Sequence, residues 1–132
     1  MHHGITAVVL GCVVMVAGCA TPSGPLAVLP MTSPAAAQQN LEGIQQYQAG
    51  KWQEAKSRFE SAIQAAPDLP EAHFNLALTL HKLGDHREAT IHFKRASELA
   101  PENKEIAGSS VYRNHLGLSS TLEKHLSGGY RY

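Results

Sequence analysis

The chain has 132 residues, enough for one modest domain, and its formal net charge is zero. All 11 basic and all 11 acidic residues follow position 40, so the part that folds is itself neutral. This balance argues against nucleic acid, which proteins bind with a basic face, and leaves no polybasic patch for anionic lipids. The only cysteines, Cys12 and Cys19, stand near the start, so the rest of the chain has no disulfide and no cysteine nucleophile.

The first residues are typical of a secretion signal. Residues 5–17 (ITAVVLGCVVMVA) form a single apolar run. A membrane-spanning helix needs about 20 apolar residues, more than this run supplies, whereas the apolar region of a signal peptide is shorter. The sequence therefore predicts a signal peptide over residues 1–18. The alternative is an uncleaved anchor with an unmodified cysteine.

The end of the apolar run, residues 16–19 (VAGC), resembles the lipobox of bacterial lipoproteins. The resemblance implies cleavage after Gly18, a thioether-linked lipid on Cys19 and acylation of the new amino terminus. Ala20 follows the cysteine where a retention aspartate would stand, which favours an outer membrane with the protein facing the periplasm. Cys12 would leave an apolar region of only about five residues, too short for a signal.

A tether rich in Pro, Ala and Ser is predicted to follow, so that the lipidated cysteine and the tether together occupy residues 19–37. Prolines at this density disfavour helix and favour extended conformations. They are Pro22, Pro25, Pro30 and Pro34. A tether of this kind lets the folded module leave the membrane surface.

A 34-residue internal repeat organises the middle of the chain. Shifting the sequence by 34 places small, aromatic and turn residues on their counterparts. The pairs are Gly43–Ala77, Gly50–Gly84, Ala55–Ala89, Phe59–Phe93, Ala62–Ala96, Ala66–Ala100 and Pro67–Pro101. Between these positions, apolar residues recur at spacings of three and four, as in helices with one buried face.

Helix boundaries are marked within each repeat. The two aligned glycines are predicted to form tight turns, and the two aligned prolines to stop helices. Pro70 is expected to open a helix, where a missing N–H is tolerated. Asp85 and Glu88 form a capping-box-like pattern at the start of another helix.

The order Ala-x3-Phe-x7-Pro at residues 55–67 and 89–101 resembles the signature of the tetratricopeptide repeat family. The resemblance implies an all-α fold, a short solenoid of two helix-turn-helix repeats with C-terminal capping helices. The repeats would span residues 36–69 and 70–103, with the repeat domain at 38–103.

After Pro101 the register decays. Residues 102–116 are predicted to form a helix, and the pattern at residues 120–123 suggests a second short one. Because repeat arrays need a polar terminal cap, we interpret residues 104–127 as a degenerate third unit with that role, followed by a tail at 128–132. The alternative is a frayed end.

In the tetratricopeptide family, the first helix of each pair lines a concave groove that binds another protein. Carried over to this chain, the predicted groove consists of Asn40, Ile44, Tyr47, Gln48, Glu71, Phe74, Asn75, Leu78, His81 and Lys82. Asn75 matches the asparagine that often holds a ligand backbone, whereas the family's carboxylate-binding lysines are missing. The groove therefore suits an apolar or amphipathic helix or an extended peptide. Phe74 and Leu78 either contact that ligand or pack against the next helix pair.

The sequence offers no catalytic residues: no Ser-His-Asp order, nucleophile elbow or phosphate-binding glycine loop is present. The later histidines are His73, His81, His86, His92, His115 and His125. None are three or four residues apart, the spacing that a metal pair on one helix needs, and only His81 and His86 are close, across a turn. We therefore expect no metal and no cofactor.

These patterns predict a membrane-tethered adaptor or scaffold of the bacterial cell envelope, without enzymatic activity. Its partner would be another protein, bound as a peptide or helix in the concave groove. The alternative is a small-ligand or metal-binding envelope protein that uses the histidines.

Overall fold

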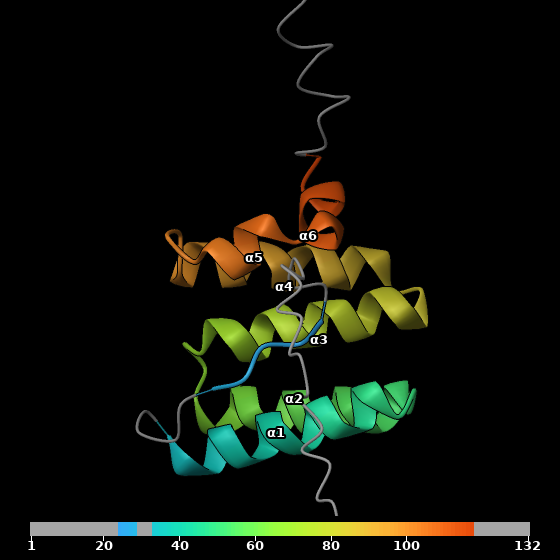
Figure 1. Cartoon of the computed structure of the whole chain (residues 1–132), viewed down its shortest axis with the longest axis vertical. Coiled ribbons are helices and arrows are strands. Elements are labelled where there is room, and N and C mark those ends of the chain that lie inside the picture. Colours follow the sequence, from blue (N-terminus) through green and yellow to red (C-terminus); the bar gives the residue numbers. More distant parts are fainter. Residues whose placement is uncertain (1–23, 29–32, 118–132) are drawn as a thin grey trace, which may run out of the picture.

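The computed structural model describes residues 24–28 and 33–117, and this part of the chain forms six α-helices and no strand (Figure 1). The helices are α1 (Pro34–Gln48), α2 (Trp52–Ala65), α3 (Pro70–Leu83), α4 (His86–Leu99), α5 (Lys104–Gly108) and α6 (Ser110–His115). The predicted all-α fold is confirmed.

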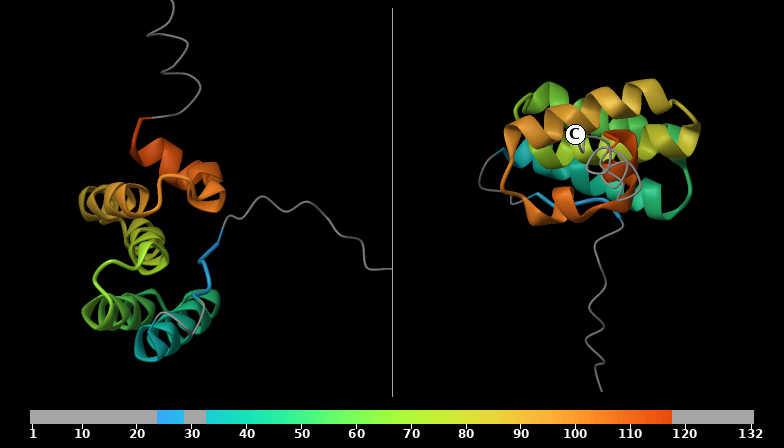
Figure 2. Two further views of the ribbon diagram at one scale, coloured as in Figure 1. Left: turned by 90° about the vertical axis from the view of Figure 1, so that its left-hand side faces the viewer. Right: turned by 90° about the horizontal axis from the view of Figure 1, so that it is seen from above.

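The helices stack in consecutive pairs. α1 packs on α2, α3 packs on α4, and α2 joins the two pairs by packing on α3. Seen end-on, the stack is an arc, with α1 and the α5–α6 unit projecting on the same side of α3 (Figure 2). This arrangement confirms the predicted short solenoid of helix-turn-helix pairs with small helices at its end.

The turns within the pairs form at the two predicted glycines. Gly50 has a φ of 73° and Gly84 a φ of 88°, in the left-handed region that side chains other than glycine's rarely enter. Gly84 ends α3 as its C-cap residue. Pro70 is in the first turn of α3, as the sequence predicted.

The first helix begins earlier than expected. The prediction of a helix-free tether up to residue 37 is wrong, because α1 starts at Pro34. The Ser33 hydroxyl caps the helix by accepting the N–H of Ala36 at 3.3 Å. The proline fits since the first helical position needs no N–H donor.

Two other boundaries differ from the predictions. Asp85 precedes α4, but its side chain makes no capping hydrogen bond, so the expected capping box does not form. The single helix predicted over residues 102–116 is instead α5 and α6, separated at Ser109, whose hydroxyl accepts the Tyr112 N–H at 3.4 Å. The helix predicted at residues 120–123 lies outside the described residues.

The core is built around two repeat-related phenylalanines, Phe59 and Phe93, which are fully buried. The Phe93 ring packs edge-to-face on Phe74, with centroids 5.6 Å apart, and on Tyr112 of α6 at 6.0 Å. Phe59 lies against Gly43: a Cβ built on this glycine would be 2.5 Å from Cε1 of the ring. The missing side chain at Gly43 therefore makes room for an aromatic ring between α1 and α2.

We expect Gly43→Ala to lower the free energy of unfolding by about 1–2 kcal/mol, because overpacking against Phe59 outweighs the helix propensity gained. Urea unfolding followed by circular dichroism measures this change. Gly108→Ala is the matched control: it is also helical, and nothing lies within 4 Å of an added Cβ. Equal stability of the two variants would contradict the proposed role of Gly43.

Candidate functional site

The concave side of the arc is occupied by the chain's own residues 24–28. This segment has no helical structure and runs across α3, between α1 and the α5–α6 unit (Figure 2). Its Leu26 is buried, 7% exposed, and belongs to the main apolar cluster together with Ile44 and Tyr112. The segment predicted to be a free tether is therefore part of the folded unit at this point.

Two asparagines hold the backbone of Leu26. Asn75 is bidentate: its Oδ1 accepts the Leu26 N–H at 2.6 Å, and its Nδ2 donates to the Leu26 carbonyl at 2.8 Å. Asn40 Nδ2 donates to the same carbonyl at 2.9 Å. The second N–H of Asn75 donates to Asn40 Oδ1 at 2.7 Å. Both asparagines are almost completely buried, so these bonds form where unpaired polar groups would be costly.

These hydrogen bonds involve only the backbone of the bound residue, whose side chain makes apolar contacts. A single asparagine satisfies both the donor and the acceptor of Leu26, as a neighbouring β-strand would do for one residue. Such recognition depends on an extended conformation more than on sequence. The predicted groove residues Asn40 and Asn75 are thus brought together around one segment of extended chain.

The other predicted groove residues of the second repeat do not lie together: some are in the core and others are at the surface. Phe74 and Leu78 are 1% and 2% exposed, and the Phe74 ring packs on Phe93, so they belong to the core. Glu71 is half-buried, and His81 joins a histidine cluster described below. Lys82 is exposed, and its Nζ lies 5.9 Å from the ring centroid of Trp52.

In the first repeat, Ile44 is buried beside the bound segment, whereas Gln48 is exposed. Tyr47 packs edge-to-face on Trp52, with centroids 4.9 Å apart. Burial raises the pKa of the Tyr47 hydroxyl above its ordinary value of 10.0.

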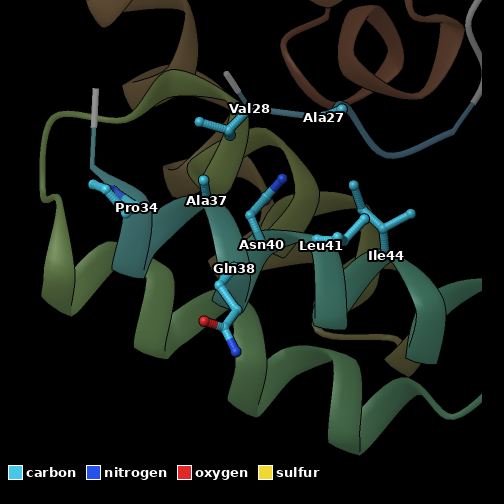
Figure 3. Close-up of a pocket in the computed structure, with 8 residues that line it drawn as sticks. All are labelled: Ala27, Val28, Pro34, Ala37, Gln38, Asn40, Leu41 and Ile44. Carbon is cyan, nitrogen blue, oxygen red and sulfur yellow. The ribbon is translucent and has the colours of Figure 1, made fainter. Parts of the chain in front are cut away.

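An apolar hollow of about 280 Å³ lies between the bound segment and α1 (Figure 3). Its lining residues are Ala27, Val28, Pro34, Ala37, Gln38, Asn40, Leu41 and Ile44. Leu41 is 54% exposed, so its side chain is open to solvent at the edge of the hollow. Sequence reasoning missed this hollow because half of its wall comes from residues assigned to the tether.

Comparison with known proteins bears on this arrangement. Residues 46–109 match the family model described as tetratricopeptide repeat. The matched segment runs from the last residues of α1 through α5, and it contains Asn75 and the whole of the second helix pair. No curated protein matches the chain. None of the helices in the described ranges is both long and apolar enough to cross a membrane.

Within the tetratricopeptide match, His73 of α3 and His92 of α4 form a pair. Their rings are stacked with centroids 5.2 Å apart, and the two Nδ1 atoms are separated by 3.0 Å. The Pro67 carbonyl lies 2.9 Å from His73 Nε2 and can only accept, so this nitrogen carries the proton. In the neutral pair, His92 Nδ1–H therefore donates to the lone pair of His73 Nδ1.

The first repeat fills the same place with different residues. The positions one repeat length before the two histidines hold Gln39 and Arg58, and the guanidinium donates to the amide oxygen at 3.2 Å. At these aligned positions, each repeat therefore has a polar contact that joins the two helices of the pair.

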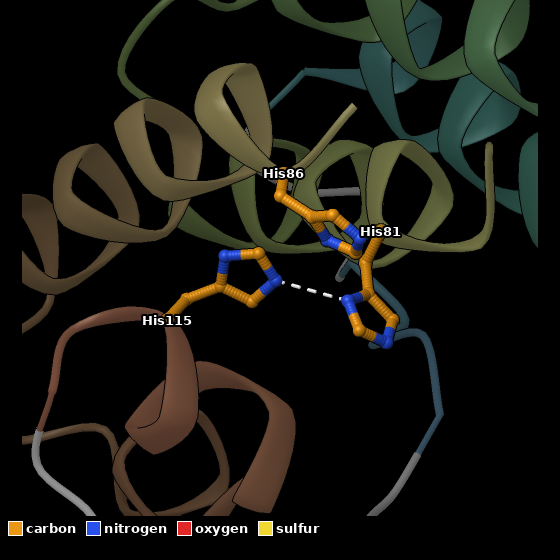
Figure 4. A group of neighbouring side chains, drawn as sticks. All are labelled: His81, His86 and His115. Atoms are coloured by element: carbon orange, nitrogen blue, oxygen red, sulfur yellow. Dashed lines mark hydrogen bonds between the residues drawn. The ribbon is translucent and has the colours of Figure 1, made fainter. Parts of the chain in front are cut away.

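A second cluster joins α3, α4 and α6. His81, His86 and His115 each offer a ring nitrogen, and these three atoms all lie within 4.8 Å of one another (Figure 4). His81 Nδ1 and His115 Nε2 are 2.9 Å apart. Burial lowers the pKa of both His81 and His115, and the positive charge that His86 can carry lowers both further.

The prediction that the histidines are too far apart considered spacing along single helices. His81 and His115 are separated by one repeat length, so the register places them at equivalent positions of successive units. The 34-residue spacing of these two histidines is visible in the sequence, although the residues around His115 no longer follow the repeat pattern. The contact between these histidines is a second site feature that was not predicted from the sequence.

We expect the protein to lose stability as the pH falls from about 7 to about 5. Burial lowers the pKa of His73 and His92 below the ordinary 6.5. The opposing effects do not reverse this: the hydrogen bond to the Pro67 carbonyl and the charge of Asp68 raise the pKa of His73, and the charge of Glu88 raises that of His92. The unfolded chain therefore takes up protons first, so stability is full above pH 6.5 and declines below it.

Melting temperatures measured across this pH range check the expectation. The matched variant is His73→Gln with His92→Arg, which copies the Gln39–Arg58 pair of the first repeat and removes both titrating rings. Its melting temperature should fall less over the same range. A variant with an unchanged pH profile would show that other groups cause the loss.

Proposed function

We propose that this protein is an adaptor of the bacterial cell envelope that holds an extended segment of a partner protein in its concave groove. Tetratricopeptide repeats indicate a role in protein–protein interaction, and such repeats are generally non-enzymatic modules. The function proposed here adds where the partner binds and in which conformation.

One observation carries the proposal: an extended segment already lies in the groove, with both backbone groups of Leu26 bonded to Asn75. The groove is therefore complementary in shape and hydrogen bonding to an extended chain. An extended partner segment with an apolar residue at the position of Leu26 would make the same contacts. Of the two ligand forms expected from the sequence, the extended peptide is favoured over the helix.

The chain's own segment would compete with such a partner. Only a few residues separate Leu26 from the start of α1, and a short connection of this kind holds the segment at an effective concentration in the mM range. A partner segment must therefore bind the groove tightly enough to displace the chain's own segment. A groove closed in this way is protected from non-specific contacts until the right partner is present.

We expect a labelled peptide with the sequence of residues 22–30 (PSGPLAVLP) to bind the Leu26→Asp full-length chain at least about tenfold more tightly than the unmodified chain. The substitution puts a charge in a buried site and so releases the internal segment. Fluorescence anisotropy of the peptide measures both affinities.

Adding Asn75→Ala to Leu26→Asp should abolish peptide binding, whereas adding Gln48→Ala, at an exposed position, should not. Circular dichroism confirms that each variant is folded. Equal peptide affinity of the Leu26→Asp and unmodified chains, or no effect of Asn75→Ala, would refute the proposed groove.

We propose further that a lipid on Cys19 tethers the adaptor to a membrane, most favourably the outer membrane on its periplasmic side. Cys19 lies outside the described residues, and the proposal is supported by the lipobox-like sequence around it. Several acyl chains bury enough methylene groups, at about 0.8 kcal/mol each, to hold a protein on a membrane.

Cys19→Ser should move the protein from the membrane to the soluble fraction when cells are fractionated. Cys12→Ser, the matched control within the apolar run, should leave it on the membrane. Retention of the Cys19→Ser protein in the membrane fraction would contradict lipidation, while leaving the groove proposal untouched.

A further inference from the structure

Beyond the groove, the cluster of His81, His86 and His115 has the composition of a metal site. The three rings come from the end of α3, the start of α4 and the end of α6 (Figure 4). Neutral imidazole is a preferred ligand for zinc, copper and nickel ions. We propose that these three histidines bind one divalent transition-metal ion, for which Zn²⁺ is the probe.

The separations suit such an ion after a small movement. Zn–N bonds of about 2.0–2.1 Å in tetrahedral geometry place ligand nitrogens about 3.3 Å apart. His81 Nδ1 and His115 Nε2 are 2.9 Å apart, and all three ligand nitrogens lie within 4.8 Å. His86 is exposed, so it can close the remaining distance by changing its rotamer.

Thr90 prepares one of the ligands. Its hydroxyl donates to the His86 carbonyl at 2.8 Å, which uses its only proton. The contact of 2.9 Å between Thr90 Oγ1 and His115 Nδ1 must then be donated by the ring. His115 is thereby held in the tautomer whose Nε2 lone pair points at His81, and an outer-shell contact of this kind is typical of metal-binding histidines.

At His81, metal binding requires a proton shift. Without metal, His81 Nδ1–H donates to His115 Nε2, because that nitrogen carries a lone pair. With metal, Nδ1 gives its lone pair to the ion and the proton moves through solvent to Nε2, so the ring stays neutral. The adjacent cation Lys82 reaches toward Trp52 of α2, where its Nζ lies 5.9 Å from the ring centroid.

A bound ion would connect the second helix pair to the C-terminal cap. α6 has only six residues and packs on α4 and α5, so an ion bound jointly by His115, His81 and His86 would add a link between α6 and the second helix pair. Three protein ligands leave a fourth position for water or for a group from another molecule. The other close pair, His73 and His92, supplies two rings from α3 and α4 and serves as an internal control.

The test titrates Zn²⁺ into the full chain, purified without a histidine tag, by isothermal calorimetry. One Zn²⁺ per chain is expected. His86→Gln should weaken binding at least about tenfold, as should His115→Gln. Because His86 is exposed, its substitution leaves the fold intact even if His115→Gln loosens the cap. Zn²⁺ should raise the melting temperature of the unmodified chain more than that of His86→Gln.

Thr90→Val should also weaken Zn²⁺ binding, and Thr90→Ser, which keeps the hydroxyl, should restore it. The control variants His73→Gln with His92→Arg, and His2→Ala with His3→Ala, should bind Zn²⁺ like the unmodified chain. Absence of stoichiometric binding, equal affinity of His86→Gln and the unmodified chain, or loss of binding in either control would overturn the proposal. Because peptide binding is measured separately, each of these outcomes leaves the groove proposal standing.

Discussion

The structure depends on the burial of helix α3 from every side. All residues from 72 to 80 are buried, because α2, α4 and the bound segment 24–28 each cover part of its surface. A helix in this position can carry polar residues only if each finds a partner. Asn75 bonds to Leu26 and Asn40, and Thr79 donates back to the Asn75 carbonyl at 2.8 Å. No buried side-chain nitrogen or oxygen among the described residues lacks a partner.

Much of the fold could be predicted from the sequence because its physical causes recur at one fixed interval. The glycine turns, the helix pairs and the positions of Phe59 and Phe93 all return in the second repeat where the first repeat places them. Docking of Leu26 could not be predicted in this way, since its partner Asn75 is far along the chain and the segment has no periodicity. The start of α1 was misplaced because the proline density outweighed the capping potential of Ser33.

The two repeats have the same helix arrangement but carry different side chains at some equivalent positions. Gln39 and Arg58 in the first repeat become His73 and His92 in the second, and both pairs join the two helices by a polar contact. Sequence reasoning recognised the positions that the two repeats share but not the variable ones that face each other. The histidines can act together only in the folded chain, because the stacking of the repeats brings rings from separate helices into contact.

The groove and the histidine cluster both involve α3 and the α5–α6 unit. Peptide binding in the groove and Zn²⁺ binding at the histidines can therefore affect each other. Tyr112 of α6 belongs to the same apolar cluster as Leu26, and His115, one turn later, belongs to the proposed metal site. If Zn²⁺ shifts α6 and thereby changes the affinity of the groove by some factor, peptide binding must change the affinity for Zn²⁺ by the same factor. Equal peptide affinity with and without Zn²⁺ would mean that the two sites bind independently, although Tyr112 and Leu26 share one apolar cluster.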